Sequence, residues 1–153
     1  SNPINLHNFK NLGFEPFNLD LLKGYLWKNI KEKNRDLKSI LLDQTYIAGI
    51  GNIYASEILF DANLNPFKLG RNLRKKDFDR LLKSIEKIIN KAIKMGGVTI
   101  KDYRNISGEL GYFQINLQVY GREGLSCLKC RNLISKIKRN GRSTFYCKNC
   151  QKK

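Results

Sequence analysis

Four cysteines near the C-terminal end are the residues best suited to chemistry. They form two Cys-x-x-Cys pairs, Cys127 with Cys130 and Cys147 with Cys150, sixteen residues apart, and they are all the cysteines of the chain. Paired thiolates at this spacing are typical of a tetrahedral zinc site in which each pair supplies one knuckle. Because four thiolates leave no open coordination position, we expect one structural Zn²⁺ ion that folds the segment and does no chemistry.

Two disulfide bonds are the alternative for the same residues. Such a framework is typical of small, cysteine-dense secreted chains, whereas here only 4 of 153 residues are cysteine and no apolar signal segment stands at the start. Zinc is therefore the favoured interpretation. The free thiols and the missing signal segment also predict a cytoplasmic protein.

The segment between the two cysteine pairs predicts a basic β-hairpin. Asn140-Gly141 is a strong turn signal, because both residues tolerate positive φ. Apolar residues on either side indicate two short strands: Leu133, Ile137, Phe145 and Tyr146. From Asn116 to Lys153 there are ten Lys and Arg residues against one acidic residue. Arg142 beside the turn is thus a candidate for contacting nucleic-acid phosphates; a merely solvated basic face is the alternative.

The composition of the whole chain points the same way. A length of 153 residues allows one ordinary domain, or a core with a small appendage that a metal stabilises, and 41% hydrophobic residues support a packed core. The formal net charge of +16 predicts a polyanionic partner. The sequence has no long apolar run and no basic amphipathic anchor, so we expect no membrane association.

The chain before the cysteines predicts a mainly helical domain. Residues 1–17 lack periodicity and predict a lead-in or linker, with Ser1-Asn2 resembling the remnant of a cleaved tag. Helical spacing predicts one helix from a cap at Asn18 to about Asn34 and a shorter one over Leu37–Thr45. Further along, it predicts a helix over Ile53–Ala62.

Two glycines, Gly49 and Gly51, separate the second and third predicted helices. They allow a ligand to approach the backbone closely, and the free N–H groups of the following helix would point at it. Asn52 at the start of that helix can donate to a phosphate or can simply cap a plain helical hairpin. The residues alone leave both interpretations open.

The second half of the helical region holds one long helix and one loop. An apolar stripe along Lys75–Lys94 predicts a helix facing the core, which Gly96-Gly97 would end. Residues 98–111 form a polar loop whose length suits a functional role, and the strict alternation of Phe113–Tyr120 predicts a half-buried strand. The predicted fold class is mainly α, with helix, turns and helix around Gly49 and Gly51, followed by a small α+β hairpin finger. We divide it into a lead-in (1–17), a DNA-binding helical domain (18–111) and a strand with the four-cysteine finger (112–153).

A series of motifs extends from the second predicted helix to the last cysteine pair. They are Leu41–Gln44, Ala48–Tyr54, Glu57–Phe60, Gly96-Gly97-x-Thr99, Asp102-Tyr103, Gly111–Phe113, Leu117–Arg122, Gly141-Arg142-x-Thr144-x-Tyr146-Cys147 and Cys150-Gln151. Over roughly residues 12–151 this series resembles the helix-two-turn-helix and zinc-finger part of bacterial formamidopyrimidine-DNA glycosylases. The endonuclease VIII group shares both features, but Gly51–Tyr54 and Thr99–Tyr103 look closer to the formamidopyrimidine branch.

The resemblance implies an enzyme of base-excision DNA repair. Family members remove oxidised purines, such as 8-oxoguanine and formamidopyrimidines, and then act as AP lyases at the abasic site, with the base flipped out of the duplex. Their nucleophile is an N-terminal proline followed by glutamate, assisted by a lysine of a β-rich N-terminal domain. Pro3 cannot replace it, because Asn2 acylates its nitrogen. The resemblance therefore implies the C-terminal, DNA-binding half, inactive alone, monomeric and associated with the bacterial nucleoid.

The family's DNA-binding residues fall on matching positions of this chain. Asn52, with the neighbouring Gly51 and Tyr54, would bind the phosphates that flank the lesion, and Lys38 would support it. Arg142 would contact phosphates around the flipped nucleotide. The family also assigns this arginine as proton donor in δ-elimination, although a permanently charged guanidinium suits phosphate clamping better.

Two loop residues and the cysteines complete the residues implied by the resemblance. Thr99 and Tyr103 would contact the extruded base, although Val98 stands where a second threonine is frequent. Arg131-Asn132 replaces the usual Cys/Gly-type turn after the second cysteine, and the four cysteines bind zinc.

Two other functions fit the same sequence. One is a stand-alone zinc-containing nucleic-acid-binding protein that never had a catalytic half; an upstream Met-Pro-Glu start would decide against it. The other is a zinc unit that serves protein contacts, for which binding indifferent to salt would be the sign. Lesion preference cannot be deduced from these residues.

Overall fold

The computed structural model describes residues 4–5, 19–32, 34–43, 47–48, 51–96, 117–139 and 141–153. The helices in these ranges are α1 (Leu19–Glu32), α2 (Leu37–Leu42), α3 (Asn52–Asp61), α4 (Lys75–Gly96) and the short 3-10 helix η2 (Gly70–Asn72). The strands are β1 (Ile4–Asn5), parallel to β2 (Ile47–Ala48), and β3 (Ser135–Arg139), antiparallel to β4 (Arg142–Tyr146). The predicted helical domain with a terminal hairpin is thereby confirmed.

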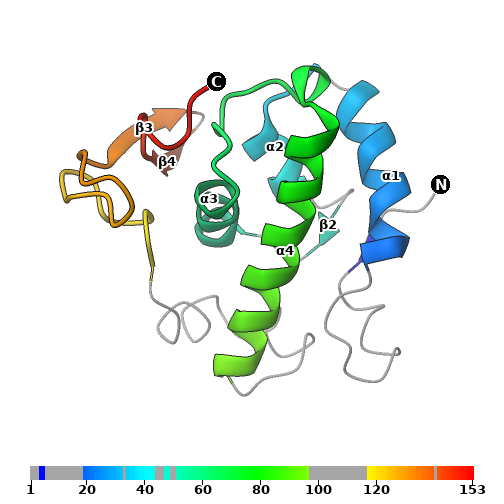
Figure 1. The fold of residues 1–153 in the computed structure, drawn as a ribbon, viewed down its shortest axis with the longest axis horizontal. Helices are drawn as coiled ribbons and strands as arrows, with labels where there is room; N and C mark the ends of the chain where they lie inside the picture. Colours follow the sequence, from blue (N-terminus) through cyan, green and yellow to red (C-terminus); the bar gives the residue numbers. More distant parts are fainter. Residues whose placement is uncertain are drawn as a thin grey trace.

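Helix α3 occupies the middle of the molecule. It lies between the β3–β4 hairpin and α4 (Figure 1), and it packs against α2, α4 and β4. All seven residues from Tyr54 to Phe60 are buried. A helix that is buried all round belongs to the core of a fold and does not form its surface. Helix α2, helix α4 and the hairpin are therefore positioned against α3.

The end of α3 is fixed by a backbone motif. Asn63 takes the left-handed conformation with φ of 57°. Its N–H donates to the Phe60 carbonyl, while the Leu64 N–H donates to the Leu59 carbonyl. This pair of bonds is the Schellman arrangement, for which asparagine is a suitable residue after glycine. The motif turns the chain sharply, so that the following loop passes beside the finger.

Helices α1 and α2 begin where the sequence predicts them. In α1, Leu26 and Ile30 are fully buried. Helix α2 ends at Leu42, before the predicted Thr45, because Asp43 takes extended backbone and its carboxylate accepts from the Arg35 guanidinium at 2.6 Å. The start of α2 is capped by Asp36, whose carboxylate accepts from the Ser39 N–H.

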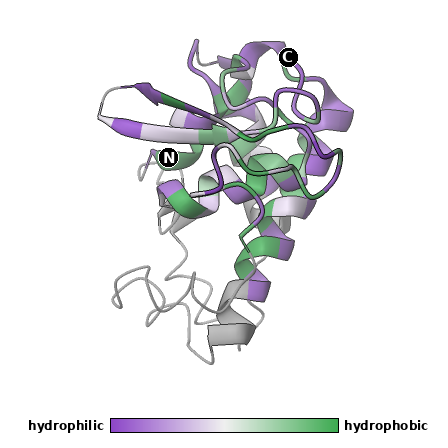
Figure 2. Cartoon of the chain, turned by 90° about the vertical axis from the view of Figure 1, so that its left-hand side faces the viewer, coloured by the Kyte–Doolittle hydropathy of each residue, from purple (hydrophilic) through white to green (hydrophobic). Residues whose placement is uncertain are grey.

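Helix α4 extends to Gly96, two residues beyond its predicted end. Its buried residues follow the predicted stripe: Phe78, Leu81, Leu82, Ile85 and Ile89, with Ile88 partly buried. Figure 2 shows hydrophobic residues gathered toward the middle of the molecule and hydrophilic residues along the outer edge of the long helix. The side chains of Ala92 and Ile93 lie outside the described residues, as does Gly97.

The hairpin is as predicted, but the strand expected before the finger is not present in the described part of that segment. The turn between β3 and β4 includes Gly141, which has the positive φ of 78° that this turn needs, while Asn140 lies outside the described residues. The strand predicted over Phe113–Tyr120 is wrong for residues 117–120, which contain a bend and a turn and no strand. Residues 113–116 lie outside the described ranges. Leu133 lies in an isolated bridge and is exposed.

Gly70 in η2 packs closely against α1 and α2. Its N–H donates to the Arg35 carbonyl at 2.8 Å. A Cβ atom at this position would lie 2.6 Å from the Ile30 carbonyl oxygen and 2.8 Å from Cδ1 of Ile40. Since the nearer of these atoms belongs to the backbone of α1, the helices would have to separate to make room.

We therefore predict that Gly70→Ala lowers the free energy of unfolding by about 2 kcal/mol through overpacking. Gly24→Ala is the matched control, because nothing lies within 4 Å of its added Cβ and the residue is exposed within α1. That substitution should stabilise the chain by up to about 1 kcal/mol through helix propensity. Denaturant unfolding measures both, and equal effects of the two substitutions would contradict this account of the packing.

Candidate nucleic-acid interface and zinc site

The four cysteine sulfurs converge on one point. Their Sγ atoms all lie within 4.8 Å of one another. The distance from Cys127 to Cys150 is 3.8 Å and that from Cys130 to Cys147 is 3.5 Å. A tetrahedron with zinc–sulfur bonds of about 2.3 Å has edges of roughly 3.8 Å, whereas a disulfide would bring two sulfurs to about 2.0 Å. The residues therefore fit one tetrahedral Zn²⁺ ion, and the disulfide alternative is wrong.

Hydrogen bonds to the sulfurs support the same conclusion. The Lys129 N–H donates to Cys127 Sγ and the Cys150 N–H to Cys147 Sγ, each at 3.4 Å. The Asn132 backbone N–H, with further hydrogen bonds, lowers the pKa of Cys130 to about 6. Burial and the neighbouring sulfurs raise the pKa of Cys150 to about 12. A divalent cation supplies the positive charge that lets all four sulfurs bind as thiolates.

One knuckle residue departs from its favoured backbone conformation. Arg131 follows the second cysteine and has φ of 71°, in the left-handed region where glycine is at ease. The resemblance to the glycosylases already indicates that a residue such as glycine is usual here. The knuckle keeps its shape through two backbone bonds, from the Arg131 N–H to the Cys127 carbonyl and from the Cys127 N–H to the Asn132 carbonyl.

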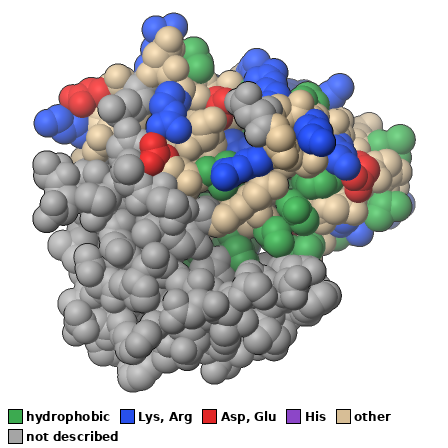
Figure 3. Space-filling view, turned by 180° about the vertical axis from the view of Figure 1, so that it is seen from behind, with side chains coloured by type: hydrophobic (Ala, Val, Ile, Leu, Met, Phe, Trp, Pro, Cys, Tyr) green, Lys and Arg blue, Asp and Glu red, His purple; other side chains and the backbone are tan. Residues whose placement is uncertain are grey.

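A cleft of about 370 Å³ lies between α2 and the hairpin. Its basic lining residues are Arg35, Lys38, Arg139 and Arg142, and its acidic ones are Asp36 and Asp43. Positive charge by itself does not locate the interface, because Lys and Arg side chains are spread over the described surface (Figure 3). The cleft is distinguished because three of the residues predicted to bind DNA line it or lie at its edge.

Lys38 is the buried cation of this cleft, with 5% of its surface exposed. Its Nζ donates to the Ser143 carbonyl at 3.0 Å and to the Thr144 hydroxyl at 2.7 Å. Burial lowers its pKa from the ordinary 10.5 to about 8, with Asp36 opposing this shift and Arg142 adding to it. The side chain thus joins α2 to β4 directly.

Asn52 is the first residue of α3, and it does not cap the helix. The N-cap is Gly51, and the Asn52 side-chain nitrogen donates to the Ser143 carbonyl at 2.9 Å. The interpretation of Asn52 as a simple helix cap is therefore wrong. Gly51 is exposed, and its added Cβ would meet nothing within 4 Å. Gly51 thus leaves the start of α3 open to solvent, and a helix start is a place where backbone N–H groups can bind an anion.

Arg142 follows the hairpin turn directly, exposed at the start of β4. Across the hairpin it pairs with Arg139, whose guanidinium lies 4.1 Å from the centre of the Phe67 ring. Stacking of this kind holds a guanidinium in place while leaving its N–H groups free for a ligand. The structure thus brings two arginines together at the mouth of the cleft.

The other predicted DNA contacts stay predictions. Tyr54 is 2% exposed within the helical core, so its side chain packs α3. Thr99 and Tyr103, in the loop 98–111, lie outside the described residues, and their contacts with an extruded base stay a prediction.

The sequence does not predict the buried hydrogen bonds that join the segment before the first knuckle to α3. Glu57 is buried and accepts three consecutive backbone N–H groups, from Gln118, Val119 and Tyr120, at 2.6 to 3.0 Å. Burial raises the pKa of Glu57, against these hydrogen bonds, which favour the carboxylate. The three bonds require the backbone to bend around one carboxylate, which is why this segment is not a strand despite its alternating pattern.

Two further joints lie at the C-terminal end of α3. Lys129 of the first knuckle donates to the Phe60 carbonyl and to the Asn63 side chain. Gln151, fully buried, donates to the Leu64 carbonyl and accepts from the Cys147 N–H, while Asn65 donates to its main-chain carbonyl. The position of Arg139 opposite Arg142 could have been predicted, because an Asn-Gly turn places its flanking residues opposite each other. The joints at the end of α3 have no such local pattern in the sequence.

Taken together, the fold is a helical domain whose central helix is capped by Gly51 and packs against a four-cysteine zinc finger. Comparisons with known proteins agree with this class. Residues 12–104 match the family described as the formamidopyrimidine-DNA glycosylase H2TH domain, and residues 124–153 match the zinc finger found in FPG and IleRS. The chain belongs to the formamidopyrimidine-DNA glycosylase family.

Relatives and solved structures extend the match. A formamidopyrimidine-DNA glycosylase of Rickettsia africae is 48% identical over 143 residues, which cover 94% of this chain and 52% of that protein. One of Prochlorococcus marinus is 47% identical over 92% of this chain and 48% of its own length. A Lactococcus lactis Fpg in complex with DNA containing an abasic site superposes with a TM-score of 0.73 at 36% identity, covering 92% of this chain and 49% of its own.

The chain spans about half the length of the curated relatives that it matches. The MutM (Fpg) protein of Thermus thermophilus shows the same proportion, with a TM-score of 0.72, 38% identity, 90% of this chain and 51% of its own. None of the helices in the described ranges combines the length and the apolar character that crossing a membrane requires.

The zinc site yields a direct prediction. Chelation of the metal should unfold the finger, because its small apolar cluster includes two of the ligands, Cys127 and Cys147. Cys147→Ser should lose both stoichiometric zinc and the intense visible absorption that Co²⁺ shows among four thiolates. Lys148→Ser, an exposed neighbour in the same knuckle, is the control and should keep both. Full zinc content in Cys147→Ser would overturn the four-ligand assignment.

Lys38 yields a prediction about pH. Because its folded pKa is lowered to about 8 from 10.5, the unfolded chain binds more protons between these values. The penalty of burying the ammonium is complete below about pH 8 and is relieved as the pH rises. The unfolding free energy of wild type, relative to Lys38→Met, should thus increase by on the order of 1 kcal/mol between about pH 8 and 10.

Denaturant unfolding across this pH range makes the measurement. Lys91→Met removes the same charge from an exposed position and controls for net charge. If the stability curves of wild type and Lys38→Met remain parallel, Lys38 is not a buried ammonium in solution.

Proposed function

We propose that this chain is the DNA-binding part of a bifunctional DNA glycosylase and AP lyase that removes oxidised purines. Its partner is duplex DNA containing an oxidised base or an abasic site. The observation that carries the proposal is that Lys38 and Asn52 both donate to the carbonyl of Ser143, the residue directly after Arg142. Three DNA-binding positions of the family, from two helices and the finger, are thereby held in one small area.

The proposed roles follow from the geometry. The exposed start of α3 at Gly51 binds a phosphate, because a helix N-terminus favours negative charge. Arg142 clamps a neighbouring phosphate, which suits its fork of N–H donors better than δ-proton donation does. Lys38 contributes charge at the floor of the cleft and holds the hairpin through Ser143 and Thr144.

Solved structures of relatives support the choice of ligand. Complexes of Lactococcus lactis Fpg contain DNA with an abasic site or with FAPY-dG. We infer that this chain recognises the same class of lesion-bearing duplex, with Thr99 and Tyr103 in the loop over the extruded base. The same inference covers a monomer in the bacterial cytoplasm, associated with the nucleoid, and the division into 1–17, 18–111 and 112–153.

Binding and chemistry should separate in this chain. Pro3 carries Asn2 on its nitrogen and has no free secondary amine for a Schiff base. With zinc bound, the chain should bind a duplex that holds a stable abasic-site analogue, with an affinity that falls steeply as salt rises. A duplex with a natural abasic site and borohydride should give no covalent adduct. Anisotropy of labelled DNA and a denaturing gel provide the two measurements.

Arg142→Ser tests the phosphate contact within the same assay. It should weaken binding about tenfold and reduce the salt dependence by roughly one counterion. Lys91→Ser, at the far end of α4, is the charge-matched control and should leave both values close to wild type.

The same assay compares the abasic duplex with an undamaged duplex. Tighter binding of the abasic duplex would assign lesion sensing to this half of the protein, and equal binding would assign to it phosphate contacts alone. The absence of binding at both low and high salt concentration, or a covalent adduct trapped by borohydride, would overturn the proposal.

A further inference from the structure

A second group of cations lies outside the cleft, where α1 ends and α4 begins. We define it as the α1–α4 basic surface, made of Lys31, Arg71, Arg74, Lys75 and Arg80. The carboxylates that contact it are Asp77, which is buried, and Asp79, which pairs with Lys75 at 3.3 Å. Five cations against two carboxylates leave the surface strongly positive.

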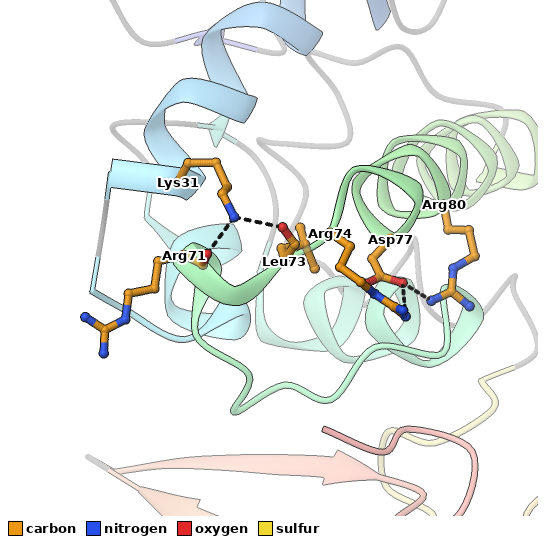
Figure 4. A network of polar contacts seen from close by, with 6 residues as sticks. All are labelled: Lys31, Arg71, Leu73, Arg74, Asp77 and Arg80. Carbon is orange, nitrogen blue, oxygen red and sulfur yellow. Dashed lines mark hydrogen bonds and ion pairs between the residues drawn. The ribbon is translucent and has the colours of Figure 1, made fainter.

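Each of these cations is held in place by the fold, apart from Arg71. Lys31 donates to the main-chain carbonyls of Arg71 and Leu73 (Figure 4). Arg74 and Arg80 donate to the two sides of the Asp77 carboxylate, at 3.0 and 2.6 Å. Burial alone would raise the pKa of Asp77. The hydrogen bonds from the two guanidiniums outweigh this effect, so the pKa is lowered. One buried negative charge thus orients two exposed positive ones, which lowers the ordering cost of binding an anion.

An aromatic side chain lies among the cations. The partly buried Trp27 ring has the ammonium groups of Lys31 and Lys75 each 5.3 Å from its centre, and it packs on Phe78 at 4.8 Å. Cation–π contacts alone account for this arrangement as a stabilising device. Cations fixed around an aromatic surface are also what grooves for nucleic-acid backbones use.

Backbone hydrogen bonds join the segment of the basic surface that holds Arg71 to the segment that lines the cleft. Arg35 lines the cleft, and its carbonyl accepts from the Gly70 N–H at 2.8 Å, directly before Arg71. An isolated antiparallel bridge between Asp36 and Leu69, the neighbours of Arg35 and Gly70, joins the same two segments. Arg71 extends away from the polar network in Figure 4, and its side chain pairs with no carboxylate among the described residues. A polyanion leaving the cleft past Arg35 would meet Arg71 next.

We propose that the α1–α4 basic surface is a second phosphate-contact surface, which carries the duplex backbone beyond the segment held at the cleft. The inference rests on the proposed DNA-binding function of the cleft and adds a longer footprint to it. Duplex DNA fits better than an acidic peptide, because regularly spaced phosphates can satisfy Arg71, Arg74 and Lys75 in series. The contacts carry no base-reading element, so they add affinity without sequence preference.

The test compares two duplex lengths, about 12 and about 24 base pairs, each with a central stable abasic-site analogue; at 3.4 Å per base pair they span roughly 40 and 80 Å. The zinc-loaded chain should bind the longer duplex about tenfold more tightly, with a salt slope steeper by about two. Trp27 is the single tryptophan of the chain, so its emission should change with the long duplex and not with the short one.

Arg71→Ser combined with Lys75→Ser should abolish the gain from length and leave binding of the short duplex within about twofold of wild type. Lys31 is left intact because it holds two carbonyls of the fold. Lys83→Ser combined with Lys91→Ser removes equal charge from exposed positions further along α4 and should keep the gain. Thermal unfolding of all variants shows that the fold is preserved.

The outcomes separate this inference from the proposed function. Binding of the short duplex without a gain from length would overturn the second surface and leave the cleft in place, whereas failure to bind either duplex would overturn both. Equal loss in the two double variants would show general electrostatics, against the proposal. A Trp27 response to polyglutamate but not to the long duplex would assign the surface to an acidic protein.

Discussion

The carbonyl oxygen of Ser143 fixes the position of the finger arginine, because Lys38 and Asn52 both donate to it. A main-chain acceptor cannot rotate away as a side chain can, so Arg142, one residue earlier, is placed relative to α2 and α3 at once. The bond also accounts for the burial of Lys38, since an ammonium is tolerated in a fold only where its N–H groups are satisfied. The interface is therefore a property of the assembled molecule and not of the finger or the helices alone.

Zinc and α3 have complementary roles in that assembly. The metal fixes the finger internally, since four sulfurs around one ion define the ends of the hairpin segment. The polar joints along α3, at Glu57, Phe60 and Leu64, fix the finger externally. Each joint pairs a finger residue with a main-chain or buried partner of α3 or of the turn that follows it. Two independent sets of interactions thus position the backbone that carries Arg142.

The features that could be predicted from the sequence depend on neighbours along the chain. Cysteine spacing, the Asn-Gly turn and the apolar stripe of α4 are local patterns, and the structure follows them. The features that could not be predicted depend on distant partners. Residues 117–120 alternate like a strand, yet Glu57 captures their N–H groups from about sixty positions away. Likewise, Tyr54 matched a family motif at the edge of the glycine turn, while packing all around α3 placed its side chain in the core.

The sequence distances of these contacts imply an order of assembly. Cys127 and Cys150 are 23 residues apart, whereas Lys38 and Thr144 are separated by 106. Closing the longer loop costs about 1 kcal/mol more in chain entropy, and its partners must already be folded before they can meet. We therefore expect the finger to close around its metal first and then to dock on a preformed α3. In a cell short of zinc, the helices would complete folding with Phe60 uncovered, and quality-control proteases would meet a half-assembled molecule.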